Sequence, residues 1–175
     1  DLSVDRAKLT AHDRGFSHTI KTGDVTNQRS SGRCWLFAGL NTLRPQILKK
    51  HNLANFEFSQ NYSFFWDKLE KANLFLEGIL RTLDRPLDDR HVAWLLKTPF
   101  PDGGQWNMVV DLIARYGLVP LDVMPDTKHS SGTGELNDIM SCLLRKDAAR
   151  LRALKGAGKG IDELRAAKVE MLADV

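Results

Sequence analysis

The stretch NQRSSGRCW at residues 27–35 decides the fold of this sequence, because a helical pattern of apolar residues begins directly after it. Those apolar residues recur at spacings of four, three and four: Leu36, Leu40, Leu43 and Ile47. This period predicts a helix from about Cys34 to about residue 49. Cys34 then lies in the first turn, where unpaired backbone amides and the helix dipole stabilise an anion.

Cys34 is the candidate nucleophile of this stretch. A thiol attacks a carbonyl group as the thiolate, and the start of a helix favours that form. The oxyanion produced by the attack needs donors about 3 Å away. Gln28, six residues earlier, offers a neutral amide for this purpose, and the backbone amide of Cys34 is the second candidate donor. Gly32 allows tight backbone geometry before the helix, and Trp35 can shield the site from water.

Composition bounds the class of protein. The chain has 175 residues, 42% hydrophobic and 27% charged, which is typical of one globular domain or part of a larger one. Its 25 basic and 22 acidic residues are spread along the chain, so we expect no nucleic-acid partner. No apolar run approaches the roughly 20 residues of a membrane-spanning helix, and no signal-peptide core is present. We therefore expect a soluble, cytoplasmic protein, although residue 1 is not Met and need not be the natural start.

Cysteine usage argues against metal sites and disulfides. Cys34 and Cys142 are the only cysteines, too few for a disulfide framework or for a zinc site without matching histidines. Cys142 lies among apolar residues of a predicted helix, so we predict a buried free thiol there. The glycine-rich run at residues 156–160 lacks the spacing of a phosphate loop. No metal or cofactor is therefore expected.

The rest of the chain is predicted to be mainly helical. Residues 1–26 have no sustained period and suggest an extended arm. A long helix is predicted over 59–83 from a stripe of apolar residues: Phe65, Leu69, Ala72, Leu76, Ile79 and Leu83. Shorter helices are predicted from Asp88 or Asp89 to Lys97, from the run DGGQW at 102–106 to Gly117, over 136–156, and from 161 onward, with a loop at 125–134.

Gln28, Gly32, Cys34 and Trp35, in register before an apolar helix, resemble the signature of the papain family. The wider runs at 27–41, 56–60, 64–68 and 102–106 are similar to its bleomycin hydrolase branch, which includes bacterial aminopeptidase C. The resemblance covers about residues 24–150. Ser31 departs from secreted papain-like enzymes, which carry a disulfide cysteine there, and this departure fits a reducing cytosol.

The resemblance implies an α+β papain-like cysteine proteinase fold, with this chain forming mainly the helical left-hand domain and helical insertions. Residues 1–26 would be an N-terminal arm and 27–175 a partial catalytic domain. It also implies a cysteine aminopeptidase that cleaves peptides through an acyl-enzyme and assembles as a homohexamer, with its own C-terminal tail restricting cleavage to chain ends. Gly103 and Gly104 would bind the substrate backbone; alternatively, they only open the helix before Trp106.

A thiol peptidase also needs an imidazole base and a group, usually Asn, that orients it. No histidine matches the family pattern, and each of the five is expected at a solvated surface: His12, His18, His51, His91 and His129. The resemblance implies that the catalytic His and Asn belong to a second half that this chain does not contain, so we expect the chain alone to be inactive. The alternative is a non-catalytic oligomeric binding or assembly module in which Cys34 is vestigial.

Overall fold

The computed structural model describes residues 5–11 and 15–175, and these are mostly helical. The elements are α1 (Arg6–Thr10), α2 (Cys34–His51), α3 (Gln60–Arg81), α4 (Arg90–Lys97), α5 (Trp106–Tyr116), the 3-10 turn η1 (Leu121–Val123), α6 (Lys128–Ser131), α7 (Gly134–Gly156) and α8 (Ile161–Ala173). In the described ranges, β-structure is limited to two isolated bridges, Ser30 with Gly132 and Phe58 with Pro120. None of these helices is long and apolar enough to cross a membrane.

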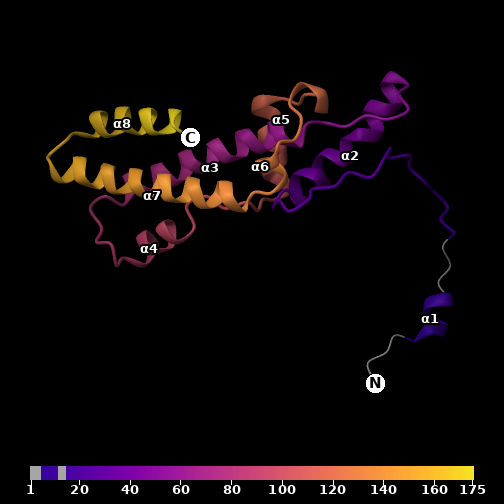
Figure 1. The fold of residues 1–175 in the computed structure, drawn as a ribbon, viewed down its shortest axis with the longest axis horizontal. Coiled ribbons are helices and arrows are strands. Elements are labelled where there is room, and N and C mark those ends of the chain that lie inside the picture. The colour runs from indigo at the N-terminus through magenta and orange to yellow at the C-terminus, as the bar shows by residue number, and fades with distance from the viewer. Residues whose placement is uncertain (1–4, 12–14) are drawn as a thin grey trace.

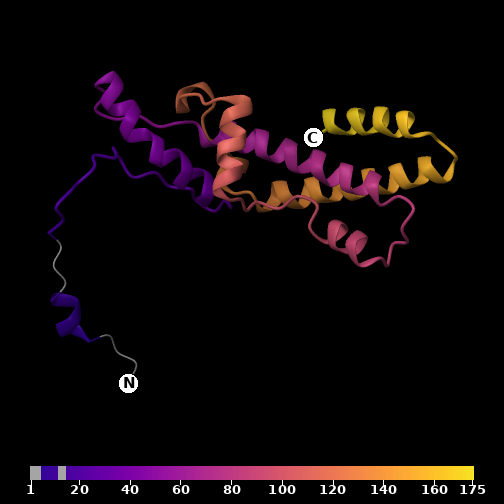
Figure 2. The same cartoon turned by 180° about the vertical axis from the view of Figure 1, so that it is seen from behind.

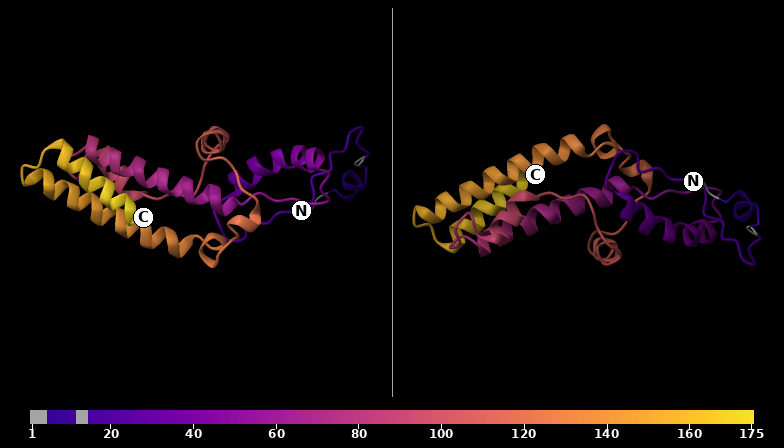
Figure 3. Two further views of the ribbon diagram at one scale, coloured as in Figure 1. Left: turned by 90° about the horizontal axis from the view of Figure 1, so that it is seen from above. Right: turned by 90° about the horizontal axis from the view of Figure 1, so that it is seen from below.

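Helix α3 is the central element of the fold (Figure 1). Helices α7 and α8 run alongside its C-terminal part, and α2 and α5 pack against its N-terminal part. The view from behind shows α5 crossing α3 steeply, and α1 standing off from the other helices (Figure 2). Seen from above and below, the molecule is elongated, with α1 and α2 toward one end and the α7–α8 pair at the other (Figure 3).

Two apolar clusters hold these helices together. The larger lies between α3, α7 and α8 and includes Leu76, Leu144 and Leu164. The smaller joins α2, α3 and α5 through four buried side chains: Leu36, Phe64, Val109 and Leu112. This smaller cluster fixes the first turn of α2, which carries Cys34, against α3 and α5.

The helix boundaries follow the predicted signals closely. Ser59 caps α3 by accepting a hydrogen bond from the Tyr62 amide, and Asp89 caps α4 by accepting from the amides of His91 and Val92. Gly117 ends α5 with a φ of +71°, which glycine adopts without strain. Helix α2 continues through Pro45 to His51, slightly beyond the predicted end.

Several local predictions were wrong. Phe65, placed on the buried stripe of α3, is 46% exposed, because the inward face near α5 carries Phe64, Asp67 and Lys68 instead. Cys142 is exposed rather than buried. The inward face of α7 carries Met140 and Leu144. Cys142 is two positions from each of them, so its side chain points to the opposite side of the helix.

Two predicted loops contain short helices. The arm at 1–26 includes α1, and the loop at 125–134 includes α6, which is held by a capping box between Thr127 and Ser130. Helix α8 ends at Ala173 instead of running to the last residue. His12 and the other arm residues at 1–4 and 12–14 lie outside the described residues.

Candidate active site

The loop before Cys34 is held in shape by its own hydrogen bonds. Gln28 Nε2 donates to the Ser31 carbonyl at 2.8 Å, and Ser31 Oγ donates back to the Gln28 carbonyl at 2.5 Å. Arg29 between them adopts the left-handed conformation, with φ of +57°, and its amide donates to Asn27 Oδ1 at 2.8 Å. An amide group has two N–H donors, and the Ser31 contact uses one of those on Gln28. The other donor can serve a ligand.

Cys34 is the first residue of α2, and it is exposed. The residue at the N-cap, Arg33, gives no side-chain hydrogen bond to the first turn. The thiol therefore stands at a helix start that presents its backbone amides to incoming groups, as the sequence predicts. This placement is what nucleophilic attack on an external carbonyl requires.

Arg33 anchors the start of α2 from inside the protein. Its side chain is fully buried, and its guanidinium binds the Asp126 carboxylate through two hydrogen bonds of 2.6 and 3.3 Å. Arg33 Nε donates to Ser31 Oγ at 2.9 Å, and the guanidinium also lies over the rings of Phe37 and Phe64. The residue beside the nucleophile is thus tied both to its own loop and to the segment before α6.

Residues 102–104, which we call the wall, pack directly against residues 27–35, which we call the nucleophile loop. Trp35 Nε1 donates to the Asp102 carbonyl at 3.2 Å. A Cβ atom on Gly104 would lie 2.5 Å from the Trp35 ring, so only glycine fits there. Gly103 is exposed, and a Cβ atom on it would meet nothing within 4 Å. The contact with Trp35 therefore explains why residue 104 is a glycine, whereas no contact among the described residues requires a glycine at residue 103.

A cluster of charged side chains from α3 lies beneath the wall. Lys68 pairs with Asp102 at 2.7 Å, and Lys71 pairs with Asp67 at 2.7 Å. Burial raises the pKa of Asp67 to about 6 against the opposing effect of Lys71, and burial lowers the pKa of Lys68. Burial alone would raise the pKa of Asp102, but hydrogen bonds from Lys68 and Thr133 outweigh it and lower that pKa.

Sequence reasoning missed Asp67, Lys68 and Lys71. The apolar stripe gave no signal for them, because Asp67 and Lys71 lie on the side of the helix opposite to Phe65 and Leu69, which the period predicts to be exposed. When an i,i+4 pair of opposite charges is buried, its remaining donors need acceptors, and here they bind backbone carbonyl groups.

Comparison with known proteins shows the family and the fold of this chain. The model of the peptidase C1-like family matches residues 1–175. The chain belongs to the peptidase C1-like family. Its fold prediction is confirmed, because the crystal structure of PepW from Lactobacillus rhamnosis HN001 superposes with a TM-score of 0.91 at 49% identity, over 97% of this chain and 38% of that one.

Relatives of this peptidase C1-like chain include aminopeptidase C from Lactobacillus delbrueckii subsp. lactis, 50% identical over 160 residues, which are 91% of this chain and 36% of the relative. Aminopeptidase C from Streptococcus thermophilus is 46% identical over 97% of this chain and 38% of its own length. Aminopeptidase G from Lactobacillus delbrueckii subsp. lactis is 48% identical over 87% of this chain and 35% of its own length. The chain thus spans little more than a third of these relatives.

The histidines of the peptidase C1-like chain that the structure describes are all exposed. His18 contacts Ser17, His91 packs near the Trp94 ring, and His129 Nδ1 lies 3.9 Å from a Glu135 oxygen. None of these contacts involves Cys34. Within the described ranges, no group of three His, Cys, Asp or Glu side chains could hold a metal ion.

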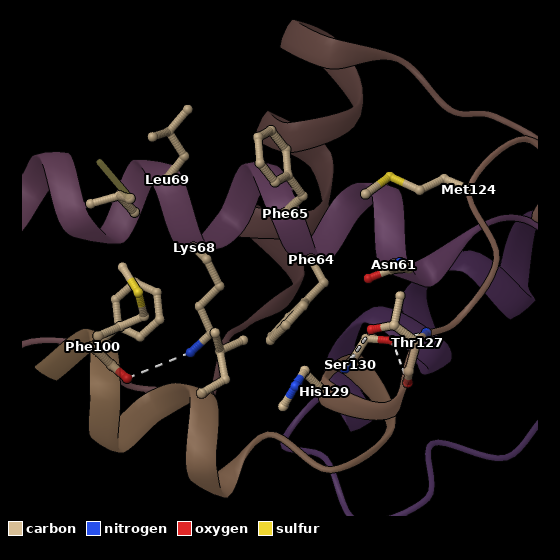
Figure 4. A pocket seen from close by; sticks show the side chains of 13 residues that line it. Asn61, Phe64, Phe65, Lys68, Leu69, Phe100, Met124, Thr127, His129 and Ser130 are labelled. Carbon is tan, nitrogen blue, oxygen red and sulfur yellow. Dashed lines mark hydrogen bonds between the residues drawn. The ribbon is translucent and has the colours of Figure 1, made fainter. Parts of the chain in front are cut away.

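The peptidase C1-like chain also has an apolar pocket of about 250 Å³ between α3, α7 and the segment before α6 (Figure 4). Phe64, Phe65 and Leu69 reach it from α3, and Phe100 and Met124 reach it from loops. Neither Cys34 nor Gln28 lines this pocket, so it is not the candidate catalytic site.

Proposed function

We propose that this chain supplies the nucleophile and the oxyanion donor of a cysteine aminopeptidase. One observation carries the proposal. The exposed thiol of Cys34, in the first turn of α2, follows a loop whose shape is held by two hydrogen bonds between Gln28 and Ser31. Membership of the peptidase C1-like family and relatives named aminopeptidase C and G support it.

In the proposed reaction, the Cys34 thiolate attacks the carbonyl carbon of the first peptide bond, and the electron pair of the C=O bond moves to oxygen. The free N–H of Gln28 and the backbone N–H of Cys34 stabilise this oxyanion. When the carbonyl re-forms, the C–N bond breaks and the leaving amine takes a proton from an imidazolium. Water, deprotonated by the same imidazole, then hydrolyses the thioester and frees the thiol.

We assign the imidazole and its orienting Asn to residues outside this chain. The described histidines are exposed, and none has a contact with Cys34 among the described residues, while the relatives are about two and a half times as long. The 175 residues alone are therefore expected to lack peptidase activity. The wall is assigned to substrate binding, with Gly103 and Gly104 alongside the extended peptide and Trp35 at its edge.

Peptides are the proposed substrates, and cleavage at chain ends is the proposed mode, in a cytoplasmic homohexamer without metal, cofactor or nucleic acid. Support for the reducing compartment comes from Ser31, a buried residue that braces the loop by hydrogen bonds, and from the two free cysteines. The hexamer and the exopeptidase mode rest on the resemblance alone.

A thiol-directed probe separates this function from a binding module with a vestigial Cys34. Cys34 and Cys142 are both exposed, so a difference in their reaction rates reports activation rather than access. We expect an epoxysuccinyl peptide to label Cys34 of the full-length protein at least about a hundredfold faster than Cys142. Equal labelling of the two would favour the binding module.

A further inference from the structure

Lys71 lies beneath the wall and takes no part in the chemistry proposed above. Its ammonium group has three N–H donors, and three acceptors receive them: Asp67 Oδ2 at 2.7 Å, the Asp102 carbonyl at 2.9 Å and the Gly103 carbonyl at 2.7 Å. Lys71 is only 9% exposed, and its Nζ lies 5.3 Å from the centre of the Trp35 ring. Every donor of Lys71 is thus used, and two of them hold the backbone of the wall.

The contact with Gly103 sets the direction of the peptide group between Gly103 and Gly104. The C=O and N–H of a trans peptide group point in opposite directions. Because the Gly103 carbonyl points to Lys71, the Gly104 N–H points away from it. Among the described residues, no acceptor receives this N–H. It is a free donor on the segment that packs against Trp35, the residue that follows Cys34 in sequence.

We propose that Lys71 is a positioning residue for substrate binding, which turns the Gly103–Gly104 peptide group so that the Gly104 N–H meets a backbone carbonyl of the bound peptide. The inference rests on the proposed function, because it assumes that a peptide lies beside Cys34. Recognition of the peptide then depends on Lys71 as well, a residue of α3 that is remote from Cys34 in sequence.

Asp67 completes this arrangement as the counter-ion of Lys71. It is 2% exposed, and an ammonium buried beside it without an opposite charge would be strongly destabilised. Lys68 has a different task, since it binds the Pro101 carbonyl at 3.1 Å and the Asp102 carboxylate at 2.7 Å. Of the two lysines, only Lys71 contacts the Gly103 carbonyl.

The test compares two reactions of Cys34 in the full-length protein, read by mass spectrometry of the Cys34 peptide. Iodoacetamide has no peptide backbone, whereas an epoxysuccinyl dipeptide needs the wall to align it. We expect Lys71→Met to slow the epoxysuccinyl dipeptide about fivefold to tenfold, the effect of one lost hydrogen bond, and to leave the iodoacetamide rate within twofold. Lys71→Arg, which keeps the charge and several donors, should recover part of the loss.

Two further variants make the result decisive. Lys168→Met removes a lysine that binds Asn73 and Glu77 of α3 rather than the carbonyl groups of the wall, and it should change neither rate. Because Lys71→Met leaves Asp67 buried without its partner, the double variant Asp67→Asn/Lys71→Met removes both charges together and protects the fold. The same selective loss is expected of it.

Equal loss of both reactions in a folded variant, or loss of neither, would overturn the positioning role. Failure of the proposed function looks different: wild-type Cys34 would then react with the epoxysuccinyl dipeptide no faster than Cys142, whatever stands at position 71.

Discussion

Gly32 and Asp102 are packed so tightly that a Cβ atom on Gly32 would lie 2.3 Å from the Asp102 Cβ. The nucleophile loop and the wall can approach each other only because residue 32 has no side chain. The same Asp102 binds Lys68 and Thr133 through its carboxylate, and Trp35 through its carbonyl. Asp102 therefore joins the nucleophile loop to both α3 and the start of α7.

Gly32→Ala should separate the loop from the wall. The added methyl group overlaps the Asp102 side chain, so we expect a loss of about 2 kcal/mol in the free energy of unfolding and a large loss of activity. Urea denaturation of the full-length protein measures the first. Gly134→Ala is the control, because its methyl group would meet nothing within 4 Å. Equal destabilisation by the two changes would contradict the tight contact.

Arg33→Met should destabilise the protein by about 3 kcal/mol, because it removes a buried charge that binds Asp126 and Ser31. Arg150→Met offers a matched comparison. Arg150 forms an exposed pair with Glu170 at 3.7 Å, and its loss should cost less than about 1 kcal/mol. Thermal and urea unfolding of both variants test the difference, and similar losses would show that Arg33 is not an anchor.

Asp67 should make stability depend on pH between about 4 and 6. Its pKa is raised from 3.8 to about 6 by burial, so in this window the folded protein holds a proton that the unfolded chain has released. The contribution of Asp67 to stability is therefore greatest below pH 4 and is lost as the pH rises to 6. Asp67→Asn should remove a fall on the order of 2 kcal/mol between pH 4 and 7.

Urea denaturation at a series of pH values, with wild type compared with Asp67→Asn, measures this contribution. Asp138→Asn, at an exposed position on α7, serves as the control. Parallel pH profiles for wild type and Asp67→Asn would contradict the burial of an ionisable pair beneath the wall.

Gln28→Ala should lower kcat by about a hundredfold, because one of the two oxyanion donors is lost. Gln28 also donates to the Ser31 carbonyl, so the melting temperature of the Gln28→Ala variant must be measured alongside its kcat. Gln28→Asn keeps an amide on a shorter side chain and should be nearly as impaired. A change confined to KM, with kcat intact, would show that Gln28 acts on substrate binding rather than on the oxyanion.

Much of the helical framework could be predicted because its signals are local. Asp89 and Gly117 were predicted to mark helix ends, one through its side chain and the other through its conformation, and the structure confirms both. The start of α2 at Cys34 could also be predicted, because the apolar period begins directly after the short run that holds Gln28 and Cys34. The catalytic roles of these two residues stay predictions.

What sequence reasoning missed depends on contacts between distant residues. Asp67 and Lys71 occupy a buried face of α3 because backbone carbonyls more than thirty positions away need donors there. Phe65 is displaced to the surface as a result. An apolar period cannot reveal this, because it counts a buried charged residue as part of the exposed face.

Hydrolysis of an aminoacyl fluorogenic substrate by the full-length protein and its two single-cysteine variants tests the central claim most directly. We expect Cys34→Ser to lower kcat/KM at least about a thousandfold with little change in melting temperature, and Cys142→Ser to retain wild-type activity. Turnover that survives Cys34→Ser, or a wild-type protein without turnover, would contradict the assignment of Cys34 as the nucleophile.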